Sequence, residues 1–447
     1  APAQREQTLE LLEEYLRSGV MPTLPEFAPD ATKIQAFVEG VCAVDAVVIS
    51  GGGNLNSRYG WLLYERAAIA LVAEYRKIPL FISGQSLGPV LSNTDAEVLE
   101  RMLRSAVAVA VRERGSYAWC TERGIEALAG ADDATDYAPH SPELTLEYPE
   151  SVAVPELPQR YVCVTINNAD DEQAQNLAEL LEYTYQEHGL STVFLSHMGN
   201  PAQAAVAGER GDYEVHARIA EQMHTPATLA PITHADAAVR IHRGAALTLT
   251  SRYHPAVFGL AVGVPVVALV PDAFTEMRLT GVMKHYGVGE FITPLEMLGT
   301  AIPSLLLDAA VQLNDPELGA TFTELQAPRR AEVLGALAEW RQYVWERISG
   351  NDEAREPQNL PKVHQVEALN EPLRGVNRAA RRLLRRTSLE AGNEWALSDR
   401  MHSWEDARRH EIEGKVREIA GLRERAEAAE RKLAEYQGSL LKRILRR

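Results

Sequence analysis

Short apolar runs alternate with polar or glycine-rich turns and amphipathic stretches over most of the chain. Runs that are apolar throughout and are each followed by a helix are typical of parallel β-α-β units. The predicted strands are residues 43–49, 80–82 and 106–111, and, after a proline-rich stretch at 150–160, residues 161–166, 192–195, 227–231, 246–249 and 264–270. The pattern predicts an α/β protein with two doubly wound Rossmann-like domains facing a cleft, and ligands at the carboxyl ends of the strands.

The same pattern divides the chain into four parts. Residues 1–150 are predicted to form an N-terminal α/β domain that opens with helix over 1–40. Residues 151–349 form a C-terminal α/β domain that a helix over 327–348 closes. Residues 350–403 are a polar linker with a basic segment, and residues 404–447 are a helical tail.

The tail has a weak coiled-coil pattern. Ile412, Ile419 and Ala426 begin a seven-residue spacing of apolar positions that continues through Leu433 and Leu440. The second seam is poorer because polar residues interrupt it, and a stable coiled coil needs both seams apolar. Two interpretations stay open: the tail assembles a homo-oligomer, or it packs on its own body.

Charge is divided unevenly between body and tail. The net charge of −17 argues against nucleic acid as a partner, because phosphate binding needs clustered Lys and Arg. The last part is different: from Glu371 onward there are 19 basic and 13 acidic residues. Segments 374–386 and 440–447 are basic and amphipathic, and would either lie on an anionic membrane surface or form a solvated basic face.

Composition narrows the chemistry. The three cysteines form no C-x-x-C pair and no H-E-x-x-H run occurs, so neither a disulfide framework nor a metal or other cofactor is expected. No apolar run approaches the ~20 residues that span a bilayer. The expected location is the cytoplasm, with peripheral attachment at the inner face of the plasma membrane if the basic tail binds lipid.

Two small-residue loops follow the first two predicted strands. Glycines let the backbone turn with positive φ and let a ligand approach the main chain, and a helix N-terminus behind such a loop favours an anion. A glycine-rich turn that merely packs is the alternative for each loop. The predicted cleft-loop residues are Gly51, Gly52, Gly53, Asn54, Gly84, Gln85 and Ser86.

Arg112 follows the third predicted strand, at the edge where ligands are expected. The planar guanidinium suits a carboxylate or a phosphate because it donates two parallel hydrogen bonds. A purely structural ion pair with Glu113 or Glu122 is the alternative.

The most specific motif is the run Ser251, Arg252, Tyr253, His254 and Pro255. It ends a predicted strand and opens a helix, with Pro255 suited to the first helical position. An arginine and a histidine then lie at a helix N-terminus, where the helix dipole also favours an anion. His197 follows another strand of the same domain and is a further candidate; a buried structural histidine is the alternative.

Together these motifs resemble the polysaccharide pyruvyl transferase family over roughly residues 40 to 300. The residues that carry the resemblance are Gly51-Gly52-Gly53, Gly84-Gln85-Ser86-Leu87-Gly88-Pro89, Val111-Arg112-Glu113 with Ser116, and Ser251-Arg252-Tyr253-His254 with Gly263-Val264-Pro265. The resemblance implies a fold like the GT-B glycosyltransferases, phosphoenolpyruvate as co-substrate, and a sugar or lipid-linked oligosaccharide as acceptor.

The resemblance also implies roles for individual residues. His254 would be the catalytic acid/base, and Arg112 and Arg252 would bind phosphoenolpyruvate together with Ser251 and Tyr253. Arg278 would replace a lysine that members often have after the last strand of the second domain, with Lys284 as the second candidate. The chain departs from the family by opening with a helix rather than with a strand and a glycine loop.

Two other functions remain open at this stage. A nucleotide-sugar glycosyltransferase could use the same two-domain fold and the same helix-start phosphate site. A non-catalytic scaffold, assembled through the tail, is the third possibility.

Overall fold

A computed structural model describes residues 2–140, 156–198, 211–231, 235–314, 320–363, 365 and 371–397. These residues form two compact units. Unit 1 contains Ala1–Ala134, Ala331–Lys362 and Leu389–Asp399, and unit 2 contains Thr135–Arg330 and Val363–Ser388. Each unit carries its own parallel sheet, so the predicted pair of α/β domains is confirmed.

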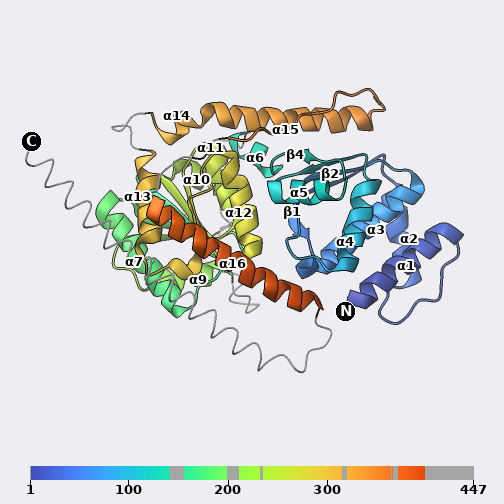
Figure 1. The fold of residues 1–447 in the computed structure, drawn as a ribbon, viewed down its shortest axis with the longest axis horizontal. Helices are drawn as coiled ribbons and strands as arrows, with labels where there is room; N and C mark the ends of the chain where they lie inside the picture. The colour runs from blue at the N-terminus through green and yellow to red at the C-terminus, as the bar shows by residue number, and fades with distance from the viewer. Residues whose placement is uncertain are drawn as a thin grey trace, which may run out of the picture. The chain divides into compact units, whose positions relative to one another are not determined.

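Unit 1 has a parallel sheet in the order β1-β2-β3-β4 (Figure 1). Its elements are β1 (Val47–Leu55), η1 (Ser57–Tyr59), α3 (Gly60–Arg76), β2 (Leu80–Leu87), α4 (Asn93–Ser105), β3 (Ala108–Val111), α5 (Arg114–Glu122), β4 (Leu128–Ala129) and α15 (Ala327–Ile348). Successive strand residues point to opposite faces. Leu80 and Ile82 therefore enter the core with α3, α4 and α5, whereas Phe81 packs against Trp340 of α15.

The first helices extend this unit. The predicted helical opening is confirmed as α1 (Pro2–Ser18) and α2 (Ala31–Cys42). Leu12 and Leu16 of α1 share a buried cluster with Leu71 of α3, because leucines spaced by four residues lie on one helix face. Helices α1 and α3 thus pack directly on each other.

Strand β1 does not end before the glycines. A turn was predicted at Gly51–Gly53, but the strand continues through them to Leu55, so that prediction is wrong. Parallel pairing also continues, from Gly52 opposite Gln85 to Leu55 opposite Leu87, with an irregularity between these pairs. The positive φ values of Gly51 and Gly52 produce the irregularity without ending the strand.

Helix α15, which ends the α/β body, packs mainly in unit 1. Most of α15 belongs there, although residues up to 349 were predicted to lie in the C-terminal domain. Trp340 donates its indole N–H to the Ser83 hydroxyl over 2.8 Å. Further along, the Leu360 amide donates to the Ala129 carbonyl over 2.7 Å, so this part of the predicted polar linker packs along the edge strand β4.

Unit 2 has a larger parallel sheet in the order β10-β9-β8-β5-β6-β7. The strands are β5 (Tyr161–Thr165), β6 (Ser191–Leu195), β7 (Ala227–Ala230), β8 (Leu247–Thr250), β9 (Val266–Val270) and β10 (Ile292–Pro294). The chain winds outward in both directions from the neighbours β5 and β8. The carboxyl ends of these two strands are the switch point, where ligands of doubly wound folds bind.

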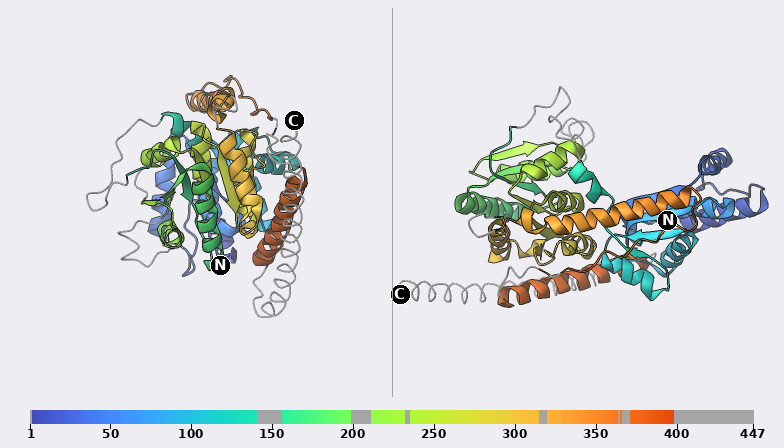
Figure 2. Two further views of the ribbon diagram at one scale, coloured as in Figure 1. Left: turned by 90° about the vertical axis from the view of Figure 1, so that its left-hand side faces the viewer. Right: turned by 90° about the horizontal axis from the view of Figure 1, so that it is seen from above.

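Helices cover both faces of this sheet (Figure 2). One packed group is α7 (Asp171–His188), α9 (Asp212–Ala220) and α13 (Ala301–Gln312), and the other is α10 (Ala235–Gly244), α11 (Tyr253–Val262) and α12 (Ala273–His285). The remaining short elements are α6 (Ala134–His140), η2 (Leu295–Met297) and α14 (Phe322–Leu325).

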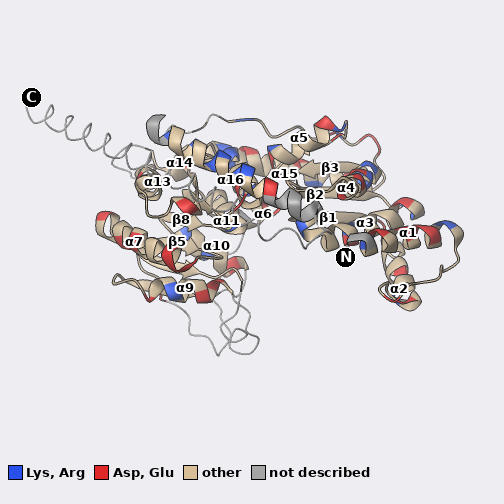
Figure 3. Ribbon diagram, turned by 60° about the horizontal axis from the view of Figure 1, so that its bottom comes forward, with Lys and Arg blue, Asp and Glu red and all other residues tan. Residues whose placement is uncertain are grey.

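The basic segment 374–386 lies in helix α16 (Glu371–Leu397), whose arginine positions are coloured blue on the ribbon in Figure 3. Its inner side packs on unit 2. Arg381 is buried and binds the Glu276 carboxylate over 3.0 and 2.7 Å, and Asn377 donates to the Ile292 carbonyl over 2.8 Å. The segment is therefore anchored by protein carboxylates on one side. The predicted tail, 404–447, lies outside the described residues.

Candidate active site

The motif predicted at the second-domain helix start lies at the junction of β8 and α11. Helix α11 begins at Tyr253 with Arg252 as its N-cap, so Pro255 is the third helical residue rather than the first. The Thr250 hydroxyl accepts the Arg252 amide over 2.8 Å and holds the turn. The helix dipole makes this helix start a favourable place for an anion.

The junction is fastened to the neighbouring strand β5. The Ser251 hydroxyl donates to the Asn167 side-chain oxygen over 2.6 Å and accepts the Asn167 amide over 3.0 Å. These bonds fix the two loops that leave the sheet at the switch point. Ser251 is buried and acts as a bridge between loops in this structure.

Arg252 is held by a carboxylate that the sequence did not reveal. Its Nε lies 2.9 and 2.8 Å from the two carboxylate oxygens of Asp212, and its Nη2 also binds Asp212. Asp212 is fully buried and accepts the backbone amides of His197 and Met198 over 2.9 and 3.0 Å. The side chain of Arg252 is 24% exposed, and its Nη1 makes no hydrogen bond with a described residue. Nη1 is thus available to an anionic ligand.

Three histidines surround one phenylalanine beside this arginine. The Phe258 ring centre lies 6.1 Å from that of His254, 6.2 Å from that of His197 and 6.2 Å from that of His242. His254 is exposed, and His197 is half-buried. The structure therefore brings the two predicted histidines into one cluster. His242 is fully buried.

Burial keeps the inner histidines neutral. It lowers the pKa of His242 to about 3 and that of His216, which accepts the Ile166 amide over 2.9 Å, also to about 3. The pKa of His197 is lowered well below its ordinary value by burial first, and the positive charge of Arg252 lowers it further. Neutral imidazoles leave Arg252 as the fixed positive charge of this group.

Arg278 of α12 lies beside the same helix start. Its guanidinium carbon is 3.8 Å from the Phe274 ring centre and 5.7 Å from the Tyr253 ring centre. A guanidinium over an aromatic face keeps its charge while its position is fixed. The predicted residues Ser251, Arg252, Tyr253, His254, His197 and Arg278 are therefore all grouped at one edge of unit 2.

Arg112 lies in unit 1 and is enclosed there. Only 1% of its side chain is exposed. Its Nε donates to the Ser86 hydroxyl over 2.7 Å, and its Nη1 forms an ion pair with Asp132. Glu113, one of the two partners considered from the sequence, lies 3.7 Å away, but the shorter pair is with Asp132. Asp132 already compensates the charge of this arginine.

The residues predicted as cleft loops lie in the last parts of β1 and β2. The predicted loop at Gly84, Gln85 and Ser86 is also wrong, because β2 continues through these residues to Leu87. The Gln85 amide nitrogen donates to the Gly51 carbonyl over 2.5 Å. A Cβ on Gly52, whose φ is +137°, would lie 3.1 Å from Gln85 Oε1 and 3.3 Å from Asn54 Oδ1. Both of these oxygens are buried and accept no hydrogen bond from described residues. They form a small group of acceptors beside glycine backbone.

Asp133 completes this edge. Its carboxylate accepts the hydroxyls of Ser50 and Ser83, both over 2.7 Å, and a Cβ on Gly84 would lie 3.0 Å from Asp133 Oδ2. In the sequence, Asp132 and Asp133 directly follow the last short apolar run of unit 1. That position is the signal that could have identified them.

Two general features bear on the chemistry. Among the described residues, no group of three or more His, Cys, Asp or Glu side chains is arranged to hold a metal ion. In the same part of the chain, every helix is too short or too polar to cross a membrane.

The family model described as polysaccharide pyruvyl transferase matches residues 6–272. The amylovoran biosynthesis protein AmsJ of Erwinia amylovora is 23% identical over 282 residues, which are 59% of this chain and 65% of that protein. This chain therefore spans less than two thirds of the length of that relative.

Two solved enzyme structures are similar to this chain at low sequence identity. UDP-N-acetylglucosamine 2-epimerase from Rickettsia bellii is 13% identical with a TM-score of 0.42, over 77% of this chain and 87% of that one. Trehalose 6-phosphate synthase from Burkholderia multivorans is 12% identical with a TM-score of 0.42, over 77% and 79%. The family match extends over more than half of the chain and includes the helix-start motif. The chain belongs to the polysaccharide pyruvyl transferase family.

Proposed function

We propose that this protein transfers the enolpyruvyl group of phosphoenolpyruvate to the hydroxyls of a sugar, as a ketal, during synthesis of a cell-wall or exopolysaccharide. The observation that carries the proposal is that Arg252 and His254 both lie at the start of α11. An anion-binding helix start and an exposed imidazole then lie one residue apart.

The donor needs at least two cationic anchors because it carries a carboxylate and a phosphate. Arg252 supplies one through Nη1, since Asp212 occupies its other edge. Arg278 is the better second anchor in unit 2, because it lies beside Tyr253. For Arg112, the role that the family resemblance implies would require the donor to compete with Asp132, so we place it after Arg278.

His254 is proposed to carry the proton transfers. An imidazole side chain is able both to accept and to donate a proton. Protonation of the methylene carbon of phosphoenolpyruvate creates an oxocarbenium-like centre, which one sugar hydroxyl attacks. Departure of inorganic phosphate and attack by a second hydroxyl close the ketal, and the two hydroxyl protons pass to the base and to solvent.

The acceptor is proposed to bind in unit 1, at the residues that were predicted as cleft loops and lie in the last parts of β1 and β2. Gln85 Oε1 and Asn54 Oδ1 are buried acceptors without partners among the described residues, and sugar hydroxyls are suitable donors for them. Glycine at 52 leaves room for a sugar to approach the main chain.

The test is phosphate release from phosphoenolpyruvate with a panel of aryl and lipid-like sugar acceptors. Acceptor-dependent release is expected in the wild type and should be lost in His254→Gln. His224→Gln is the matched control, since His224 is also exposed in unit 2 but lies outside the site. Turnover of a nucleotide sugar in place of phosphoenolpyruvate would assign the protein to the glycosyltransferases, and wild-type release by His254→Gln would refute the catalytic assignment.

A further inference from the structure

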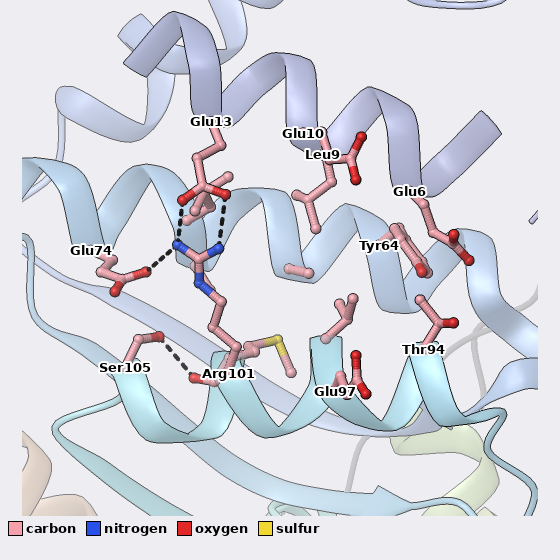
Figure 4. A pocket seen from close by; sticks show the side chains of 15 residues that line it. Glu6, Leu9, Glu10, Glu13, Tyr64, Glu74, Thr94, Glu97, Arg101 and Ser105 are labelled. Carbon is pink, nitrogen blue, oxygen red and sulfur yellow. Dashed lines mark hydrogen bonds and ion pairs between the residues drawn. The ribbon is translucent and has the colours of Figure 1, made fainter. Parts of the chain in front are cut away.

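A groove lies on unit 1, outside the proposed active site, between α1 and α4 and above α3 (Figure 4). Its volume is about 310 Å³. The floor is apolar and consists of Leu9, Ala67, Ala70, Leu71, Val98 and Met102. The rim carries five glutamates and one arginine: Glu6, Glu10, Glu13, Glu74, Glu97 and Arg101.

The single arginine of the rim is already paired. Arg101 binds both carboxylate oxygens of Glu13, over 2.9 and 2.8 Å, and approaches Glu74 to 3.4 Å. The hydrogen bond from Arg101 lowers the pKa of Glu13, so this pair is fully ionised near neutral pH. Glu10 and Glu97 are exposed and form no ion pair with a described residue. The open part of the groove is therefore negative.

The apolar floor and the negative rim together determine which kind of ligand the groove can bind. Phosphorylated sugars, phosphoenolpyruvate, nucleic acid and anionic lipid headgroups would all be repelled by the glutamates. A small polyamine would satisfy the charges but would leave the leucine and methionine floor in water. A peptide with apolar side chains on one face and basic side chains at its flanks covers the apolar floor and also pairs with the glutamates of the rim.

We propose that the groove binds residues 440–447 of the same chain. These eight residues are four apolar and four basic: Leu440, Leu441, Lys442, Arg443, Ile444, Leu445, Arg446 and Arg447. At helical spacing, the four apolar residues fall on one side and the four basic residues on the other. Residues 440–447 lie outside the part of the chain that the structure describes.

Unit 2 provides a precedent for this kind of contact. Its own basic amphipathic helix, α16, buries Leu383 and Leu384 while Arg381 and Arg385 bind the Glu276 carboxylate. The chain therefore already uses one basic segment to cover an acidic and apolar surface. The groove between α1 and α4 offers the same chemistry to the second segment.

A long connection joins the segment to the described part of the chain. Residues 398–439 separate the segment from Leu397 at the end of α16, and even a fully helical connection of that length would reach about 60 Å. A tethered segment has an effective concentration of roughly millimolar, which lets a contact of few residues form that would be too weak between separate molecules.

Disulfide trapping in the full-length protein tests the proposal. Cys42 is exposed and is replaced by serine, whereas Cys120 and Cys163 are buried and stay. Thr94→Cys at the groove edge is combined with Leu441→Cys. Under mild oxidation we expect a disulfide within one chain, identified by mass spectrometry of the linked peptides. Glu65→Cys with Leu441→Cys is the matched control, because Glu65 is exposed on α3 and does not line the groove.

Charge reversal makes the test specific. Glu10→Lys with Glu97→Lys should lower the trapping rate about fivefold, and Arg443→Glu with Arg446→Glu in the same chain should restore it. Circular dichroism confirms that each variant is folded. Equal trapping at position 65, or trapping that ignores the charge reversal, would overturn the proposal.

Two other occupants give distinct results. A disulfide-linked dimer would show that the groove takes the segment of a second copy and would overturn the intrachain assignment. If no disulfide forms and the full-length protein sediments with phosphatidylserine vesicles equally well with and without the groove reversal, the segment belongs to the membrane and the proposal is wrong.

Discussion

The carboxylate of Asp212 and the guanidinium of Arg252 form a two-oxygen pair at the carboxyl edge of the unit 2 sheet. Asp212 begins α9, and Arg252 caps α11. The pair therefore joins two loops that are forty residues apart in the chain. Because Asp212 also accepts the amides of His197 and Met198, one buried carboxylate organises both predicted histidine loops.

Asp212→Asn should loosen this edge. The amide keeps one acceptor oxygen but loses the charge, so Arg252 exchanges a charge-assisted pair for water at a cost of about 2 kcal/mol. Urea unfolding measures the loss, and the KM for phosphoenolpyruvate should rise because Arg252 is no longer oriented. Asp171→Asn is the control: Asp171 is 94% exposed and pairs with Arg218 at 3.3 Å, so its loss should be near zero. Equal effects of the two variants would contradict the organising role.

The sequence identified the strands but not this carboxylate. Continuous apolar runs such as 161–166 and 192–195 predicted β5 and β6 almost to the residue, because buried parallel strands need such runs. Asp212 follows no strand in the sequence and becomes part of the site only through its contact with Arg252. A local pattern cannot show such a contact.

Two other differences have physical causes of the same kind. Strand β4 has only two residues, too few for a periodic signal, so Asp132 and Asp133 behind it were missed. Helix α15 has an apolar face that the sequence shows clearly, but the face does not say which sheet it will cover. In the structure, Trp340 of α15 packs on Phe81 of β2, so the helix covers the sheet of unit 1.

Arg278→Lys and Arg278→Met distinguish a donor anchor from a packing residue. Lysine keeps the charge but lacks the planar fork that binds a carboxylate or phosphate through two bonds. We expect the KM for phosphoenolpyruvate to rise about tenfold in Met and less in Lys, with a small change in kcat. Arg382→Met, on the exposed side of α16, is the control. A wild-type KM in both Arg278 variants would remove this residue from the donor site.

Gly52→Ala tests the proposed acceptor group. The φ of +137° disfavours any side chain, and the new Cβ would press on Gln85 Oε1 and Asn54 Oδ1. The KM for the sugar acceptor should rise more than that for phosphoenolpyruvate. Gly124→Ala separates the two causes, because Gly124 has a φ of +62° with nothing within 4 Å of its Cβ, and there only backbone strain of about 1 kcal/mol is added. Acceptor and donor KM values that rise together would argue against a separate sugar site.

The buried histidines should make the protein lose stability in mild acid. The pKa of His242 is about 3 in the folded protein, whereas an unfolded histidine titrates near 6.5. Below pH 6.5 this histidine binds a proton in the unfolded chain but stays neutral in the folded protein. The free energy of unfolding therefore falls as the pH drops, by about 1.4 kcal/mol per histidine at one pH unit below 6.5, and is unaffected above it.

His242→Gln should remove one such contribution. Glutamine does not titrate and can still bond the Thr248 hydroxyl, which lies 3.1 Å from His242 Nδ1. Urea unfolding followed by circular dichroism should show a smaller loss of stability between about pH 6.5 and 5.5 than in the wild type. His224→Gln, at an exposed position, should keep the wild-type dependence. An unchanged pH dependence in His242→Gln would mean that this imidazole gains its proton in the folded protein, and that burial does not keep it neutral.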